Sequence, residues 1–132
     1  MMTENIQALI NYRLDQADES LEAASTLLDK KLIRPSINRA YYAMFYAVLA
    51  LLAQERKETS RHSGAITIFD RDFVKRGIFK KDFSRWLHDA FDLRQRSDYA
   101  AEYQASAEDA EITLKNALTF VDEVKKVLTK EM

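Results

Sequence analysis

The stretch INRAYYAMFYAVLALLA, residues 37–53, decides the fold of this chain. It contains neither glycine nor proline, and it closely follows Pro35, the only proline in the chain, whose fixed φ suits the first turn of a helix. Its apolar residues recur at spacings of three and four, which places them on one broad face of an α-helix. These residues are Ile37, Tyr41, Met44, Phe45, Val48, Leu49 and Leu52. The pattern predicts the strongest core helix of the fold.

A second stripe on the same helix is polar and aromatic. Arg39, Tyr42 and Tyr46 share a helix face, because they follow one another at spacings of three and four. An arginine in so apolar a helix has to be paired with an acid, solvated in a cleft or placed against an anion, since an unpaired buried charge is costly. Arg39 is therefore the first functional candidate. We expect its face to form the concave, polar side of the molecule.

The rest of the sequence predicts an all-α fold. The chain has 132 residues with only 2 glycines and 1 proline, which is too few turn formers for a β architecture. Gly77 is expected to end the third helix, and Ser106 with Asp109 to begin the fifth. We expect a single domain over residues 1–132, built as an up-and-down-type helical bundle of about five helices. Besides the helix that ends near Gln54, helical periodicity places helices over about residues 3–30, 65–76, 81–99 and 107–128.

The composition of the chain argues against several classes of function. The chain has no cysteine and only 2 histidines, which lie far apart, so neither a disulfide nor a metal site is expected, and no cofactor is indicated. No secretory leader and no membrane span are recognisable, which predicts a cytoplasmic protein. The net charge of −1 means that any RNA contact must come from a local patch. One basic run is a candidate, with six cations against two acids between Arg71 and Arg85.

Four blocks of sequence resemble the HEPN domain family. They are NRAYYAMFY at 38–46, RHSG at 61–64, FVKRG at 73–77 and LRQRSDY at 93–99, and the likeness extends over roughly residues 5–128. The small stand-alone prokaryotic members, associated with minimal nucleotidyltransferases, are the most similar. The resemblance implies a helical bundle that forms a homodimer. It also implies relatives that are metal-independent ribonucleases, often toxins paired with a nucleotidyltransferase antitoxin.

The catalytic signature of that family is an arginine followed, after four to six residues, by a histidine on the same helix. Here the arginine is Arg39, but the position seven further on is Tyr46. A histidine has an unperturbed pKa of about 6.5 and can carry a proton, whereas a tyrosine near 10 is a poor base at neutral pH. The resemblance therefore implies a module that binds RNA or a nucleotide, or that partners a nucleotidyltransferase, with weak or lost ribonuclease activity.

Two alternatives remain open at the level of sequence. In the first, the protein is an active endoribonuclease toxin in which Arg39 steers the phosphate and another group, such as His62, carries the proton. In the second, a nucleotidyltransferase partner adenylylates Tyr46 or Tyr42. Under each of these readings the homodimer brings two copies of Arg39 to one shared cleft.

The block at residues 93–99 supplies the remaining candidates. Arg94 and Arg96 are candidate RNA-binding residues, and Asp98 with Tyr99 is expected to form a structural network. Asp98 is the natural acid to pair with one of these arginines or with Arg39. Among the aromatic residues, Tyr42 and Tyr46 could stack on a nucleobase. His62 could contact phosphate at a helix N-terminus, and His88 is interpreted as a surface or partly buried packing residue.

Overall fold

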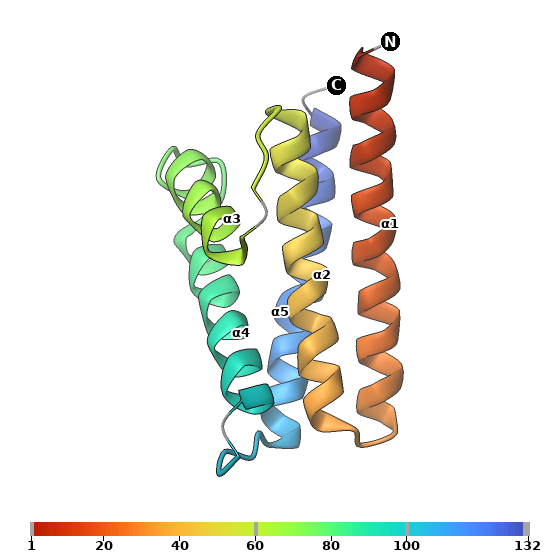
Figure 1. Cartoon of the computed structure of the whole chain (residues 1–132), viewed down its shortest axis with the longest axis vertical. Coiled ribbons are helices and arrows are strands. Elements are labelled where there is room, and N and C mark those ends of the chain that lie inside the picture. Colours follow the sequence, from red (N-terminus) through yellow and green to blue (C-terminus); the bar gives the residue numbers. More distant parts are fainter. Residues whose placement is uncertain (1, 60, 100, 131–132) are drawn as a thin grey trace.

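The computed structural model describes residues 2–59, 61–99 and 101–130, and these residues form helices without any strand. Figure 1 shows three long helices running side by side and a shorter pair on one flank, with α1 beginning and α5 ending at the same end of the bundle. The prediction of an all-α bundle is confirmed. The elements are α1 (Met2–Asp29), α2 (Ile33–Gln54), α3 (His62–Phe69), the π-helical segment η1 (Asp70–Val74), α4 (Lys81–Tyr99) and α5 (Ala107–Lys130).

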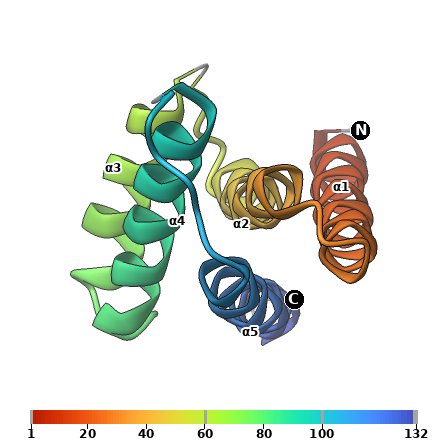
Figure 2. The ribbon, with the colours of Figure 1, turned by 90° about the horizontal axis from the view of Figure 1, so that it is seen from below.

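α2 is the central helix. Seen along the bundle in Figure 2, it lies between α1, α4 and α5. Of its 22 residues, 13 are buried, so it is apolar on nearly every side rather than along one stripe. Ser36, near its beginning, donates a hydrogen bond of 2.8 Å to the carbonyl oxygen of Ala24, which ties α2 to the end of α1. The polar side chains of α2 are therefore confined to a narrow sector.

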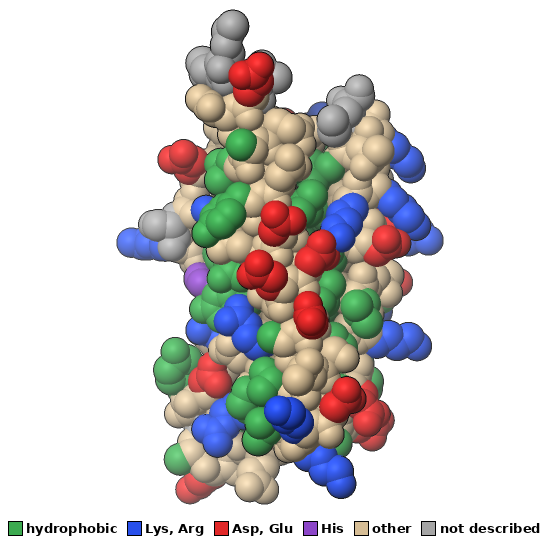
Figure 3. Space-filling model, turned by 90° about the vertical axis from the view of Figure 1, so that its right-hand side faces the viewer, with side chains coloured by type: hydrophobic (Ala, Val, Ile, Leu, Met, Phe, Trp, Pro, Cys, Tyr) green, Lys and Arg blue, Asp and Glu red, His purple; other side chains and the backbone are tan. Residues whose placement is uncertain are grey.

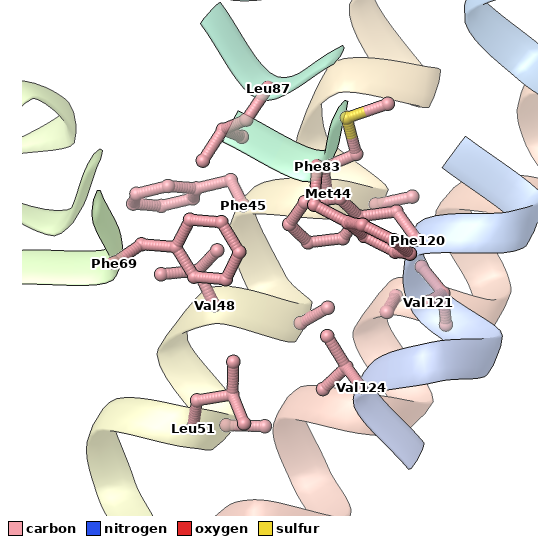
Figure 4. Close-up of a cluster of buried hydrophobic side chains, with 14 of the residues drawn as sticks. Met44, Phe45, Val48, Leu51, Phe69, Phe83, Leu87, Phe120, Val121 and Val124 are labelled. Carbon is pink, nitrogen blue, oxygen red and sulfur yellow. The ribbon is translucent and has the colours of Figure 1, made fainter. Parts of the chain in front are cut away.

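The hydrophobic core is formed around α2 by side chains from every other helix. Figure 4 shows Met44, Phe45 and Val48 of α2 meeting Phe69 of α3, Leu87 and Phe83 of α4, and Phe120 of α5. Aromatic rings join α3, α4 and α5 directly, because Phe120 lies 5.3 Å from Phe69 and 5.8 Å from Phe83 between ring centroids. Close-packed contacts of this kind fix the rotation of each helix relative to α2.

The helix boundaries depart from the sequence expectation in two places. α2 begins at Ile33, two residues before Pro35, which the helix accepts because N–H groups in the first turn have no intrahelical acceptor. The third helix begins at His62 and passes into η1, where the amide of Lys75 donates to the carbonyl oxygen of Asp70 at 2.8 Å. A π turn of this kind has no simple sequence signal.

The predicted helix ends at glycine and serine are confirmed. Gly77 has φ +83°, and the amide of Ile78 donates to the carbonyl oxygen of Phe73 at 2.9 Å, as in a helix closed by a left-handed residue. At the start of α5, the amide of Ser106 donates to Asp109 and the amide of Asp109 donates to Ser106, both at 3.0 Å. These caps fix where the segment that contains η1 ends and where α5 begins.

Candidate functional site

The site is built around Tyr42, which contacts two arginines. The Cζ atom of Arg39, three residues earlier on α2, lies 5.0 Å from the centroid of the Tyr42 ring. The Cζ atom of Arg94, on α4, lies 5.3 Å from the same centroid, and its Nη2 donates a hydrogen bond of 3.3 Å to the Tyr42 hydroxyl. Both distances are in the range of cation–π contacts. The structure thus brings together three of the residues singled out in the sequence.

Arg94 belongs to a network that joins α2 to α4. Its Nε lies 3.5 Å from Oδ2 of Asp98, one turn further along α4. The side-chain amide of Asn38 on α2 donates to the same oxygen at 3.2 Å. The acid therefore pairs with Arg94 and Asn38 rather than with Arg39. A carboxylate held between two helices in this way stabilises their relative position.

Arg39 has fewer partners than Arg94, although both arginines have a buried Nε without a hydrogen-bond partner among the described residues. Its Nη2 donates to the hydroxyl of Ser20 on α1 at 3.3 Å. Within the described part of the chain no carboxylate forms an ion pair with it, and its buried Nε has no hydrogen-bond partner. A buried donor without an acceptor costs roughly 1–3 kcal/mol, so an incoming acceptor would gain that interaction. Arg39 therefore has unused capacity to bind an anion.

Arg39 lines a cleft at the end of the bundle where α1 turns into α2. This basal cleft has a volume of about 1070 Å³ and lies between that turn, the end of α4 and the following loop. The hydroxyl of Ser97 is buried there without a hydrogen-bond partner among the described residues. Tyr99 is 76% exposed, which leaves its ring free to stack on a ligand. The charged and polar side chains that line the cleft are Lys31, Arg34, Asn38, Arg39, Ser97, Asp98, Tyr99, Tyr103 and Gln104.

Arg39 also lines a second, smaller depression between α1 and α2. This side groove measures about 280 Å³ and is bounded by Gln16, Glu19, Ser20, Ala23, Arg39 and Tyr46. Arg39 and Tyr46, two turns apart on α2, thus border one groove. Figure 3 shows the side of the molecule that α1 covers, with acidic side chains across its middle and several Lys and Arg side chains below them. Lys and Arg side chains also lie beside and above these acids, so this face carries charges of both signs.

His62 lies at the start of α3 and belongs to an aromatic cluster. Its ring stacks on Phe45 with a centroid distance of 4.0 Å, and its Nδ1 lies 2.6 Å from the hydroxyl of Tyr41. Burial first, and then the charge of Arg94, lower the pKa of His62 below its ordinary 6.5. Burial raises the pKa of Tyr41, with Arg94 acting in the opposite direction. We assign the phenol as the donor to a neutral imidazole, since both shifts favour the uncharged forms.

His62 and Arg39 are separate but share a neighbour. Among the described residues no hydrogen bond, ion pair or ring contact joins them directly. Tyr42 contacts both, because its ring centroid lies 5.5 Å from that of His62 and 5.0 Å from Cζ of Arg39. A proton carrier at His62 and a phosphate ligand at Arg39 would therefore both contact one phenol ring.

Other sequence candidates lie elsewhere. Arg96 places its Cζ 5.2 Å from the centroid of Tyr103, and it lines neither the basal cleft nor the side groove. His88, interpreted as a surface or partly buried packing residue, is half exposed, and its Nε2 lies 2.6 Å from Oδ2 of Asp70. Ser84 donates to the other oxygen of that carboxylate at 2.7 Å. The interaction ties η1 to α4 and stands apart from the clefts around Arg39.

The basic run between residues 71 and 85 is partly neutralised. Asp72 accepts hydrogen bonds from Arg71, at 2.8 and 3.1 Å, and from Lys57. These hydrogen bonds, that of Arg71 first, hold the pKa of Asp72 well below its ordinary range. Arg85 lies 3.4 Å from Asp82. The run therefore keeps a positive surplus, but it lies outside the basal cleft and the side groove.

Three contributing residues were not assigned from the sequence. Asn38 and Ser97 stand inside the blocks quoted above, and a polar residue within an apolar helix is the signal that could have marked Asn38. Ser20 gives no such signal, because its contact with Arg39 joins residues 19 positions apart on different helices. Only the packing of α1 against α2 brings these two residues together.

Residues 2–59, 61–99 and 101–130 contain neither a candidate membrane span nor a candidate metal site. No helix there is long and apolar enough to cross a membrane. No group of three or more histidine and carboxylate side chains is gathered there in a way that could hold a metal ion.

Comparison with known proteins establishes the family. The HEPN domain matches residues 10–127, so the chain belongs to the HEPN domain family. A protein of Methanocaldococcus jannaschii named "Putative toxin MJ0605" is 37% identical over 95% of this chain and 90% of its own length. A protein of Thermotoga maritima, named only as a UPF0332 protein, is 32% identical over 92% of each chain. A second M. jannaschii protein with a toxin name is 31% identical over 87% of this chain and 78% of its own.

Proposed function

We propose that this protein is a HEPN module of the toxin–antitoxin type that binds RNA or a nucleotide through Arg39. The observation that carries the proposal is the state of this guanidinium, which lines the basal cleft, lacks a carboxylate partner among the described residues and keeps a buried Nε without an acceptor. A phosphate accepts two parallel N–H donors from an arginine. Lys31 and Arg34 add positive charge to the same cleft, and Tyr99 offers an exposed ring for a base.

Weak or absent ribonuclease activity is part of the proposal. Cleavage of RNA through its own 2′-hydroxyl needs a group that removes a proton, beside the positive charge on the phosphate. Tyr46 borders the side groove with Arg39, at the position where the family signature has a histidine. Because a phenol is a poor base at neutral pH, Arg39 would bind the phosphate without an efficient proton carrier next to it.

The proposal extends to partners. Two relatives carry toxin names, which supports a role beside an antitoxin, and the family resemblance suggests a small nucleotidyltransferase in that role. We propose a homodimer in which the two copies of Arg39 lie near one shared cleft, in a cytoplasmic protein. Light scattering of the purified protein at micromolar concentration tests the dimer. A mass of one chain only would remove the shared cleft from the proposal.

The binding test uses labelled single-stranded RNA and fluorescence anisotropy. Arg39→Ala should weaken binding by about tenfold or more, because it removes a charge-assisted pair of hydrogen bonds. Lys115→Ala is the matched control, since Lys115 is exposed on α5 and outside both clefts. It should change affinity by less than about threefold. Equal affinity of the wild type and Arg39→Ala would refute the proposal.

The cleavage test uses a mixed RNA substrate in EDTA. The wild type should cleave slowly or not at all, and Tyr46→His should gain activity if the missing base is the defect. The double variant Arg39→Ala with Tyr46→His should lose that gain. Rapid, metal-free cleavage by the wild type that disappears in Arg39→Ala would show that catalysis does not need a histidine at position 46.

A second candidate function is favoured by the state of His62. Its lowered pKa keeps the imidazole neutral near pH 7, so it is able to accept a proton, and Tyr42 connects it to Arg39. In this reading the protein is an active metal-independent endoribonuclease with Arg39 on the phosphate and His62 as proton carrier. Loss of wild-type cleavage in His62→Ala, with RNA affinity unchanged, would select this function over the first.

A further inference from the structure

A groove between α4 and α5 lies outside the site around Arg39. It has a volume of about 250 Å³, and its apolar lining includes Trp86 and Leu93 of α4 and Ile112 of α5. Ile112 is 51% exposed although it is a large aliphatic residue. The loop that joins the two helices crosses the end of the bundle beside the groove and contributes Tyr103. An exposed apolar strip with a polar rim is typical of a protein-binding surface.

The rim of this groove is acidic. Asp89 and Asp92 from α4 face Asp109 from α5, and the one cation in the lining is Arg96. Arg96 lies four residues after Asp92, a spacing that permits an ion pair, yet its guanidinium lies over the ring of Tyr103 instead. Three carboxylates against one guanidinium leave a surplus of two negative charges around an apolar floor.

Two of these carboxylates have no hydrogen-bond or ion-pair partner among the residues that the structure describes. α4 carries four acids, of which Asp82 pairs with Arg85 and Asp98 pairs with Arg94. Neither Asp89 nor Asp92 forms a hydrogen bond or ion pair with any residue that the structure describes. The unpaired acids of α4 are therefore the two that border the groove. Exposed like charges one turn apart repel each other, so a cation that bound between them would relieve that repulsion.

We propose that the α4–α5 groove binds a cationic amphipathic segment of a partner protein. Apolar side chains of the segment would cover Trp86 and Ile112, while its Lys or Arg side chains pair with Asp89 and Asp92. An arginine stem also packs well on an indole face. The lining favours a cationic peptide over two other ligands. The carboxylates repel an RNA backbone, and the apolar floor gives no advantage to a hydrated metal ion. The mode is that of a helix laid in a groove.

The position of Trp86 makes the proposal directly measurable. Trp86 is the only tryptophan of the chain, so intrinsic tryptophan emission reports on this groove alone. The probe is a short designed peptide that forms an amphipathic helix with leucine on one face and arginine on the other. Its matched control has glutamate in place of arginine. The arginine peptide should shift the emission saturably, and the glutamate peptide should not.

Two double variants locate the binding. Asp89→Asn with Asp92→Asn should weaken the arginine peptide by about tenfold or more, as expected for two lost charge pairs. The control, Asp15→Asn with Glu22→Gln, removes the same charge from exposed positions of α1 and should leave the affinity within about twofold. Circular dichroism checks that both variants fold. An absent or non-saturable emission change, or an equal loss in both variants, would overturn the proposal.

Discussion

Arg39 and Arg94 contact the same tyrosine, and each has a buried Nε without a hydrogen-bond partner among the described residues, but their other partners differ. Their Cζ atoms lie 5.0 and 5.3 Å from the centroid of the Tyr42 ring. Arg94 is held by a carboxylate that a side-chain amide from another helix also binds. Arg39 has one serine hydroxyl and, among the described residues, no carboxylate partner. The difference separates an arginine that completes the fold from one that is left for a ligand, although both are cations stacked on one phenol ring.

The largest effect on stability is expected from Arg94→Ala. The change leaves Asp98 with the amide of Asn38 alone and removes the donor to Tyr42. Breaking a fully buried ion pair costs roughly 3–5 kcal/mol. Because the two side chains are 13% and 24% exposed, we expect a loss of about 2 kcal/mol in the free energy of unfolding, measured with urea. A loss below about 0.5 kcal/mol would contradict the structural role.

A smaller loss of stability is expected from Tyr41→Phe, which tests the aromatic cluster around His62. Tyr41 is fully buried, and its hydroxyl binds His62. Removing the hydroxyl leaves Nδ1 of a partly exposed imidazole to find water, so we expect a loss of about 1 kcal/mol. Tyr12→Phe is a suitable control, since Tyr12 is 57% exposed. Equal stabilities of the two variants would mean that the 2.6 Å contact contributes nothing.

A still smaller effect on stability is expected from Arg39→Ala. The variant removes an arginine without a carboxylate partner in the described structure, and it also removes the cost of the unpartnered Nε, so the free energy of unfolding should change by less than about 1 kcal/mol. RNA affinity should nevertheless fall. Arg39→Lys keeps the positive charge but loses the two parallel N–H donors of the guanidinium, so it should restore only part of the affinity. If Arg39→Ala destabilised the protein as much as Arg94→Ala, the comparison of the two arginines would break down.

The smallest expected effect is on the pH dependence of the free energy of unfolding. Because the pKa of His62 is lower in the folded protein than in the unfolded chain, the unfolded state binds more protons below about pH 6.5. This contribution to stability is complete above that pH and is lost as the pH falls toward the pKa of the folded state. In His62→Gln, the drop in the free energy of unfolding from about pH 7 to about pH 5 should be smaller than in the wild type. An equal drop would exclude His62 as its source.

Local periodicity was sufficient to predict the architecture. The spacing of apolar residues in α2 and the scarcity of glycine predicted a helical bundle, and capping chemistry located Gly77 and Ser106. Spacing also placed Arg39, Tyr42 and Tyr46 on one sector, since residues three and four apart are neighbours on a helix. All these inferences depend on residues within a few turns of one another.

Contacts between helices could not be predicted in the same way. The pair Asn38 and Asp98 is 60 residues apart in sequence, and it exists because core packing fixes the rotation of α4 against α2. The different directions of Arg94 and Arg96 could nevertheless have been predicted from the sequence. Arg94 and Arg96 were grouped as RNA-binding residues, but two positions along a helix are turned by about 200°, so they cannot face the same cleft. The structure turns one toward Tyr42 and the other toward Tyr103.

The central place of α2 also governs when the protein can fold during its synthesis. A growing chain completes α2 at Gln54, whereas α5, whose Phe120, Val121 and Val124 belong to the core around α2, is made only at residues 107–130. Until α5 has left the ribosome, part of the apolar surface of α2 remains in water. A chain interrupted before that point would present a continuous apolar strip and would be prone to associate with other unfinished chains.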